Sequence, residues 1–419
     1  MPSNVVGAKR SSPSWIPATI ITLLTLATWP LAVSPLVNLE TSAPAPSAHL
    51  ALGAGFVALA PICDLMDSLT LLSVSQTIAF LVSLAALYVV WRELRWRRVG
   101  STLFREVRLA IVALASMLAF YAMCIVAPRP MARLTLDDAD AVSVDVHSHT
   151  RFSHDGRSSF TPDANRAWHR DAGFDVAFIT DHSRFEGARE AMQRNPARAG
   201  DGLTALSGVE FVGMHNHLVA LQASDSATAR LGIDSTGGRA VATGSAARYP
   251  VLVQTIPDNL DRLVPPDSSG RYGVIAIELS DGSPRGIEQS QHDRSRIVRL
   301  ADSLNLALVA GSDNHGWGRT AVAWSVLHIP GWRSLSPDSL GNAIVDRIRT
   351  ARRRSVEVIA RRTPDAAGSR VFMVATLPAV AWNILRTMSP LERITWITWA
   401  WIATALAVYA ADRRTPIVQ

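Results

Sequence analysis

The chain has 419 residues, of which 48% are hydrophobic, and its formal net charge is +6. This length leaves room for two or three units of roughly 150 residues each, and the hydrophobic share is high for a chain that is wholly soluble. The two cysteines, Cys63 and Cys124, both lie within apolar runs, which argues against a disulfide framework.

Apolar runs occupy both ends of the chain. They cover residues 16–37, 50–63, 69–91 and 109–128, and then residues 371–385 and 394–411. The runs that begin at residues 16, 69, 109 and 394 approach the ~20 residues that span a bilayer, whereas the other two are short enough for buried or interfacial helices. No small-residue cleavage site followed by a soluble chain comes after the first run, so we expect no cleaved signal peptide. We predict a multi-pass membrane protein, with about four transmembrane helices in residues 1–130 and one or two in residues 371–411.

The positive charge has an explanation that does not involve nucleic acid. Six arginines lie in WRELRWRRVGSTLFREVR, residues 91–108, between two apolar runs. Short arginine-rich loops between spans tend to stay in the cytoplasm, and the soluble part lacks a basic stripe interleaved with aromatic residues. We expect the lipid bilayer as a partner and no nucleic acid. The loop places the region after residue 128 on the extracytoplasmic side; Lys9 and Arg10, three predicted spans earlier, favour the opposite orientation but are outnumbered.

Residues 142–362 are predicted to form one α/β unit. Apolar, β-branched runs such as DVAFITDH, YPVLVQT, GVIAIELS and LALVAGSDNH alternate with helical stretches such as DANRAWHRDAG and GIEQSQHDRSRIVRLADSLN. This alternation is typical of a parallel sheet or barrel.

Histidines and carboxylates recur where the predicted strands end. In VDVHSHT, residues 144–150, alternation along a strand would place Asp145, His147 and His149 on one face. Such a stretch alone is often only a polar strand end, but similar groups follow the other strands: SHDG with His154 and Asp155, TDH with Asp181 and His182, GVE with Glu210, HNH with His215 and His217, and GSDNH with Asp313 and His315.

Side chains of this kind can converge on one metal site. The carboxyl ends of strands in an α/β barrel gather on one rim, which brings together residues that are distant in sequence. Imidazoles and carboxylates without thiolates suit zinc, manganese or iron, and a carboxylate can bridge two ions. We predict two or three divalent metal ions at this rim.

The series HSHT, SHDG, ITDH, GVE, HLVAL and GSDNH, over about residues 142–320, resembles the polymerase-and-histidinol-phosphatase (PHP) family of metal-dependent phosphoesterases. The resemblance implies a distorted seven-stranded β/α barrel, flanked here by transmembrane helices. It implies three ion positions, held by His147, His149, Glu210 and Asp313, by Glu210 and His217, and by Asp155, His182 and His315. Either His154 or Asp155 fills its position, and we assign catalytic roles to Glu210, Asp313 and His217.

One departure from the family pattern concerns the second ion. The family usually supplies another histidine from the segment that reads VLVQTIPDN here, where Gln254 and Thr255 stand instead. His215 would compensate if no bulge turned it away from His217. The second ion is therefore either weaker, absent or held differently.

Several neighbouring residues have two readings. Asp145 and Asp181 either orient a ligand histidine or cap a strand, and Arg319 either clamps a phosphate or forms a salt bridge. Trp317 either lines the pocket or is an ordinary aromatic, and Trp324 and Trp332 read as core or membrane-facing residues. The remaining histidines, His169, His292 and His328, read as structural or surface residues.

Three functions fit this sequence. The first is a membrane-anchored phosphoesterase that acts on a small-molecule phosphate mono- or diester, because clustered cations make water a better nucleophile and neutralise charge on a phosphoryl oxygen. The second is a metal-dependent hydrolase of carboxylic or carbamic esters or amides, and the third is a non-catalytic sensor or scaffold. No GxSxG nucleophile motif competes, and nothing in the sequence sets an oligomeric state.

Overall fold

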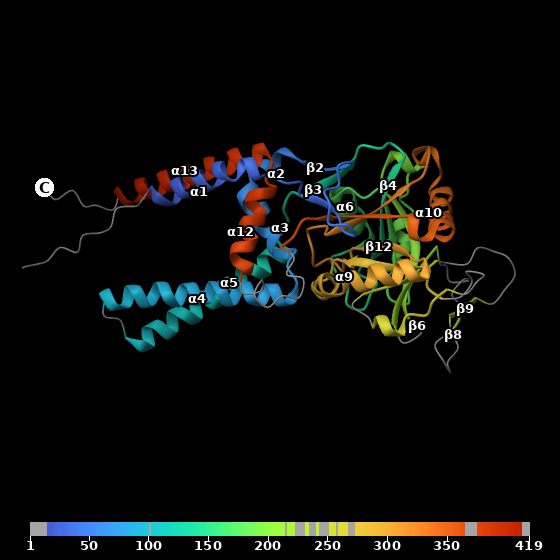
Figure 1. Ribbon diagram of the computed structural model, residues 1–419, viewed down its shortest axis with the longest axis horizontal. Helices are drawn as coiled ribbons and strands as arrows, with labels where there is room; N and C mark the ends of the chain where they lie inside the picture. Colours follow the sequence, from blue (N-terminus) through green and yellow to red (C-terminus); the bar gives the residue numbers. More distant parts are fainter. Residues whose placement is uncertain are drawn as a thin grey trace, which may run out of the picture.

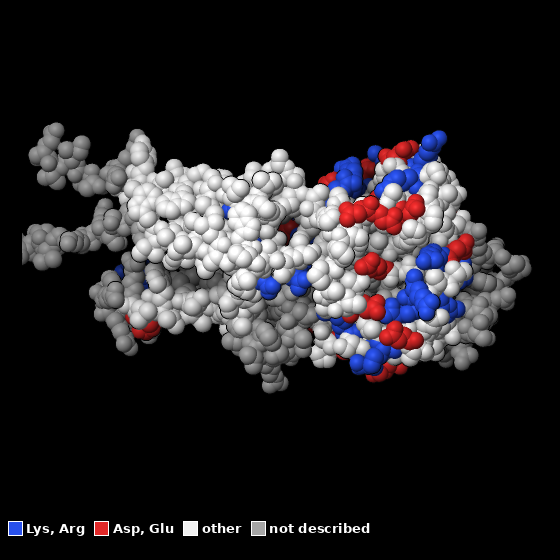
Figure 2. Space-filling view, turned by 45° about the horizontal axis from the view of Figure 1, so that its top comes forward, with Lys and Arg blue, Asp and Glu red and all other residues white. Residues whose placement is uncertain are grey.

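The computed structural model describes residues 15–99, 102–213, 216–222, 231–233, 240–242, 251–256, 259–266, 273–364 and 375–412. It divides along its long axis into a helical bundle and an α/β unit (Figure 1). Figure 2 shows that acidic and basic side chains gather on the α/β unit, whereas the visible bundle surface is almost free of them. The bundle therefore has the surface expected of helices in lipid.

Three described helices are long and apolar enough to cross a membrane. They are Val74–Leu94 within α4 (Val74–Val99), α5 (Leu103–Val126), and Pro390–Ala411 within α13 (Pro390–Asp412). Before residue 130, the described residues thus contain two helices of this length where the sequence suggests about four.

The other two apolar runs before residue 130 form shorter elements, for local reasons. The run 16–37 forms only the 12-residue helix α1 (Ile16–Ala27), about 18 Å long at 1.5 Å per residue. A short 3-10 turn with Pro30 (Trp29–Leu31) then ends it, and β1 (Leu36–Asn38) follows. The run 50–63 is divided among β2 (Ala48–Leu52), α2 (Ala54–Ala58) and α3 (Ala60–Thr70), and α12 (Thr376–Thr387) is again only 12 residues long.

The α/β unit is built on one ten-stranded sheet, in the order β1-β14-β13-β4-β5-β6-β7-β10-β11-β12. Its strands after β1 are β4 (Ala141–Ser148), β5 (Val176–Ile179), β6 (Thr204–Gly213), β7 (Asn216–Leu221), β10 (Val251–Gln254), β11 (Ala276–Asp281), β12 (Ala307–Gly311), β13 (Ala323–His328) and β14 (Glu357–Arg361). Small two-stranded sheets join β2 to β3 (Ala132–Leu136) and β8 (Leu231–Ile233) to β9 (Ala240–Ala242). The helices of this unit are α6 (Pro162–Ala172), α7 (Glu186–Met192), α9 (Pro284–Leu304) and α10 (Pro337–Ala351).

The sheet curls until its last strand returns to β4. The pairs β4–β5, β5–β6, β10–β11 and β11–β12 are parallel, and just beyond β12 the amide of Asp313 donates to the carbonyl of His147 at 2.9 Å. The amide of His149 donates in turn to the carbonyl of Asn314 at 3.2 Å. The fold is therefore a mixed α/β sheet curled like a barrel, but the expected count of seven strands is not confirmed, because ten strands share one ladder.

Apolar side chains of the sheet form the core. Val142, Val144 and Val146 of β4 are fully buried, together with Val176 and Phe178 of β5. Trp324 and Trp332 are also buried, with exposed fractions of 0% and 2%, so both are core residues. This packing holds the ends of β4, β5, β6 and β12 rigidly beside one another.

Candidate metal centre

The end of β4 provides two histidines but not the expected third ligand. The Asp145 carboxylate accepts hydrogen bonds from the amides of His147 and Ser312, each at 3.0 Å, and lies 2.8 Å from Nε2 of His169. A register shift after Asp145 interrupts the simple alternation. The expectation that Asp145 shares a ligand face, or orients a ligand histidine, is therefore wrong. Asp145 instead accepts hydrogen bonds from the backbone and pairs with the buried His169.

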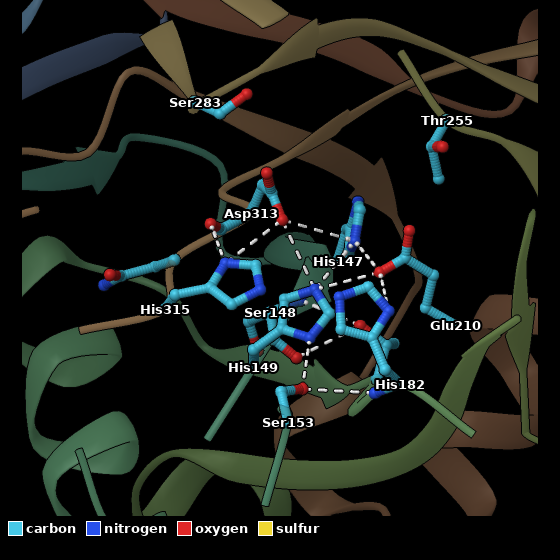
Figure 3. Close-up of polar contacts among 12 residues, drawn as sticks. His147, Ser148, His149, Ser153, His182, Glu210, Thr255, Ser283, Asp313 and His315 are labelled. Carbon is cyan, nitrogen blue, oxygen red and sulfur yellow. Dashed lines mark hydrogen bonds and ion pairs between the residues drawn. The ribbon is translucent and has the colours of Figure 1, made fainter. Parts of the chain in front are cut away.

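Glu210, in the middle of β6, is the centre of the cluster (Figure 3). Its Oε2 lies 3.2 Å from Nε2 of His147, 3.2 Å from Nε2 of His149 and 3.1 Å from Nδ1 of His182. Its Oε1 lies 2.9 Å from Nδ1 of His217 on β7. A single carboxylate thus faces four imidazoles that come from three strands or strand ends.

Asp313 and His315 complete the cluster from the loop after β12. Oδ1 of Asp313 is 3.3 Å from Nε2 of His149 and 3.4 Å from Nδ1 of His315. Asp313 adopts φ of +46°, a backbone conformation that is strained for a residue with a side chain and that is often found at functional sites. The local structure therefore holds this carboxylate toward the histidines at an energetic cost.

Asp155 lies closer to the cluster than His154. Oδ1 of Asp155 is 3.1 Å from Nε2 of His315 and 3.5 Å from Nε2 of His182. The side chain of His154 is 77% exposed, with Nδ1 3.8 Å from Asp155. The geometry favours Asp155 of the two alternatives, and it brings all eight candidate ligands into one cluster.

Two buried carboxylates in this cluster were missed in the sequence. Glu278 of β11 lies with Oε1 2.8 Å from Nδ1 of His147 and accepts from the amide of Ile256 at 3.1 Å. Asp281, also fully buried, can join His147 and Glu278 in a ligand group. The signal was a glutamate within the otherwise apolar strand AIELS, where a charge is costly unless it has a partner.

The segment that lacks the family histidine has a different role. The side-chain oxygen of Gln254 accepts from Asn216 at 3.0 Å, and its amide donates to the carbonyl of Thr255 at 3.1 Å. Gln254 is thus engaged away from the cluster, and His215 lies outside the described residues. Among the described residues, Glu210 and His217 of the second position lie in one potential ligand group with His182.

Asp181 organises the loop between β4 and α6. Its carboxylate accepts from the amide of Thr150 at 2.6 Å and from the hydroxyl of Ser153 at 3.0 Å, and Ser153 Oγ lies 2.8 Å from Nδ1 of His149. Gly187 permits this arrangement, because a Cβ there would lie 2.0 Å from the Asp181 carboxylate. Asp181 acts on His149 through Ser153 rather than by direct contact.

The carboxylates change the protonation of the two β4 histidines. Burial alone would lower the pKa of His149, but the hydrogen bonds that its ring donates to Asp313 and Glu210 raise it to about 9. Burial likewise disfavours charge on His147, but Glu278 and Glu210 raise its pKa well above the usual 6.5. For His182 and His315 burial prevails, and their pKa values are lowered.

The cluster has the composition of a cation site. In the described part of the chain, no arginine or lysine forms an ion pair with Glu210, Glu278 or Asp313. Nε2 of His147 and Nε2 of His149 lie 3.0 Å apart. Histidine nitrogens and carboxylate oxygens converge here without an arginine or lysine as counter-charge among the described residues. Such a set of ligand atoms suits divalent metal ions.

A cavity of about 640 Å³ opens over the cluster, and the residues that line it include further candidates for substrate binding. Arg285, at the start of α9, is the one arginine among the described lining residues, and Val74, the first residue of α4, also lines it. Arg319 is not part of this lining, so the expectation that it clamps a phosphate gains no support. Trp317, which is 50% exposed, packs near Arg157 and also lies outside the lining.

Comparisons with known proteins give structural likenesses only. No family model and no curated protein matches the chain. One similar solved structure is PsfC from Pseudomonas syringae, with 16% identity, a TM-score of 0.35, and coverage of 58% of this chain and 98% of that one. A second is a two-domain protein from Bacteroides vulgatus containing a predicted PHP-like metal-dependent phosphoesterase, with 16% identity, a TM-score of 0.32, and coverage of 53% and 65%. A third is an amidohydrolase from Chromobacterium violaceum, with 18% identity, a TM-score of 0.26, and coverage of 46% and 89%.

Proposed function

We propose that this protein is a membrane-anchored, metal-dependent hydrolase that cleaves phosphate esters. The supporting observation is that Glu210 and Asp313 each lie within 3.6 Å of both His147 and His149, with further candidate ligands around them and no arginine or lysine paired with either carboxylate in the described part of the chain. Divalent ions at such a site lower the pKa of water and neutralise charge on a phosphoryl oxygen. The PHP resemblance of the motifs agrees with this proposal.

The candidate residues would have different roles in holding the metal ions. His147, His149, Glu210 and Asp313 would hold the first ion, with Glu210 shared toward His217 at the second position, and with Asp155, His182 and His315 at the third. Glu278 would fix the ring of His147 by holding its Nδ1 hydrogen, the usual role of a carboxylate behind a metal-binding histidine.

Arg285 favours phosphate over a neutral ester. It lines the cavity, is exposed, and forms no ion pair with a described residue. A guanidinium matches two phosphoryl oxygens in one plane, and the first turn of α9 adds partial positive charge on the same wall. A neutral carboxylic ester or amide would leave this charge without a partner.

The arrangement of the helices indicates on which side of a membrane the α/β unit would lie. α4 begins beside the α/β unit and α5 ends there, so the arginine-rich segment between them lies at the opposite end of the bundle (Figure 1). If that segment is cytoplasmic, the α/β unit is extracytoplasmic. A reporter fused after residue 140 should then behave as extracytoplasmic, and protease should digest the α/β unit in intact cells. Protection in intact cells but not in lysed cells would reverse the orientation.

The function is tested by metal analysis followed by a substrate panel. Purified full-length protein should contain at least two transition-metal ions, and it should release phosphate or alcohol from mono- or diesters in a reaction that a chelator abolishes. Arg285→Gln should raise KM for a phosphate ester more than it lowers kcat, whereas Arg285→Lys should keep part of the affinity. Metal-replete protein that cleaves carboxylic esters or amides but no phosphate ester would overturn the phosphoesterase proposal in favour of the second function, and protein that cleaves nothing would favour the sensor.

A further inference from the structure

The rim that carries the metal centre faces the helical bundle. α9 starts next to the cluster, and four residues into it Glu288 accepts from the amide of Ser75 at 3.1 Å and from the Ser75 hydroxyl. Ser75 is the second residue of α4, whose membrane-spanning segment begins at Val74. One wall of the cavity is therefore attached to the first turn of a membrane helix, and Val74 itself forms part of the lining.

A second part of the rim around the metal centre is attached to the bundle as well. The loop that carries His315 continues to Thr320, whose hydroxyl lies 3.0 Å from the hydroxyl of Thr70 at the end of α3 and 2.9 Å from Asp67. Arg129, just after α5, donates to the same Thr320 hydroxyl at 2.9 Å. Two independent connections thus fix the rim against the end of the bundle where α4 begins and α5 ends.

The surface beside the cavity suits the headgroup layer of a bilayer. Trp317, two residues after His315 and three before Thr320, is half exposed, with the Arg157 guanidinium 5.5 Å from its ring centre. Tryptophan and arginine are both common at the membrane–water boundary. Arg285 lines the cavity at the start of α9, where it can meet an anionic headgroup.

From this placement we infer that the substrate is a bilayer lipid with a phosphate ester in its headgroup, presented to the metal centre without leaving the membrane. The inference rests on the proposed phosphoesterase function and extends it to a substrate class. The cavity of about 640 Å³ has the size of a small-molecule site. It accommodates a phosphorylated headgroup, and the acyl chains remain in the bilayer beside Val74.

The reaction is a simple hydrolysis. The oxygen of water forms a bond to phosphorus, the ester P–O bond breaks, and a proton from water goes to the departing oxygen. A lipid monoester gives a lipid alcohol and inorganic phosphate. A lipid diester gives an alcohol and a phosphate monoester, and neither reaction needs a further reactant.

The first test measures where the cavity lies relative to the bilayer and does not depend on activity. Nitroxide labels on Trp317→Cys and Arg285→Cys, in full-length protein reconstituted into phosphatidylcholine vesicles, should report headgroup depth from their accessibility to oxygen and to a water-soluble nickel complex. The native cysteines are buried, and Ser339→Cys on exposed α10 provides a matched water-exposed control. Labels at Trp317 and Arg285 that are as water-accessible as the Ser339 label would overturn the inference.

The second test separates a lipid substrate from a soluble one with the same headgroup. Vesicles that contain phosphatidic acid are compared with glycerol 3-phosphate, and vesicles that contain phosphatidylglycerol with glycerophosphoglycerol, at equal total phosphate. Confinement to the surface should favour the lipid by roughly 10-fold or more. Equal or faster cleavage of the soluble esters would overturn the lipid inference and leave the phosphoesterase function in place. Cleavage of neither class by metal-loaded protein would overturn both.

Discussion

Two buried polar clusters lie only a short loop apart, and they differ in how their charges are balanced. Around Asp67, the carboxylate accepts from Nε of Arg129 at 2.8 Å, from the Thr320 hydroxyl at 2.9 Å and from Nη1 of Arg361 at 3.0 Å. Around Glu210, the carboxylate faces imidazoles alone. The Asp67 carboxylate thus has permanently charged partners within the chain, whereas the Glu210 carboxylate has none among the described residues.

The difference separates a structural cluster from a binding cluster. A buried carboxylate between two guanidiniums has its partners in the folded chain, and removal of one partner leaves an uncompensated charge. A carboxylate among neutral imidazoles obtains its counter-charge from protons or from a metal ion. The Asp67 cluster should therefore control stability, and the Glu210 cluster should control metal content.

The largest effect is expected from Glu210→Gln. The amide keeps the shape of the side chain but loses the charge that faces His147, His149, His182 and His217, so metal content should fall at both positions that share this residue. Hydrolysis should drop by about 10³-fold, the order expected when a principal electrostatic element of a site is lost. Atomic emission analysis and initial rates provide the measurements, with Asp138→Asn at the surface as a control. Full metal content in the Glu210 variant would disprove the shared ligand.

The second prediction concerns the Asp67 cluster. Asp67→Ala leaves Arg129 and Arg361 buried beside one another without their carboxylate, which should cost about 3–5 kcal/mol of stability. Metal content per folded molecule should nevertheless stay near that of the unchanged protein. Thermal unfolding followed by circular dichroism, combined with metal analysis of the folded fraction, tests both parts. Loss of metal without loss of stability would reverse the comparison between the two clusters.

The sequence predicted the Glu210 cluster but not the Asp67 cluster, for a physical reason. Metal ligands such as His147, His182 and Asp313 follow apolar strands, and a curled parallel sheet brings strand ends together whatever the exact strand count. Asp67 meets Arg129 and Arg361 only because the bundle docks on the rim, 62 and 294 residues away in sequence. No local pattern encodes such a docking.

Errors of the sequence reading also have local explanations. Hydropathy does not show that Pro30 ends α1 after 12 residues, and thus it predicts a longer helix for the run that begins at residue 16. Strict alternation does not show the register shift after Asp145, and thus it assigns that residue to the wrong partners. Glu278 is hard to recognise from the sequence because its strand is otherwise apolar, although a buried acid in such a strand requires a partner.

Glu278→Gln should have a smaller effect than Glu210→Gln, because Glu278 contacts His147 and not the centre of the cluster. Loss of the charge behind a metal-binding histidine typically costs 10–100-fold in affinity. Metal titration by calorimetry should show a drop of this order at one position, with the others nearly unchanged. Unchanged affinity at every position would show that Glu278 does not orient His147.

The pH dependence should separate metal-free from metal-loaded protein. The folded pKa of His149 is raised from 6.5 to about 9, so its contribution to the stability of the metal-free protein is complete below pH 6.5 and disappears as the pH rises through 9. Metal ions require the deprotonated ligand, so their affinity should increase over the same range. His182 and His315, whose pKa values are lowered, titrate below this range. Between pH 6.5 and 9 the melting temperature should thus fall without metal and rise with metal, and parallel curves would contradict the assignment.

The smallest effect distinguishes the two residues of the SHDG loop. His154→Asn should change metal content and hydrolysis less than about twofold, because its side chain is 77% exposed and its nearest charged contact is Asp155 at 3.8 Å. Asp155→Asn should lower the metal content of the third position, since Asp155 lies 3.1 Å from His315 and 3.5 Å from His182. Both variants alter an exposed loop and should unfold at the same temperature when metal is removed. The metal stoichiometry of the two variants, measured under the same conditions, decides which of the two residues is the ligand. A larger loss in the His154 variant would make the histidine the ligand and would shift the loop by one residue relative to the structure.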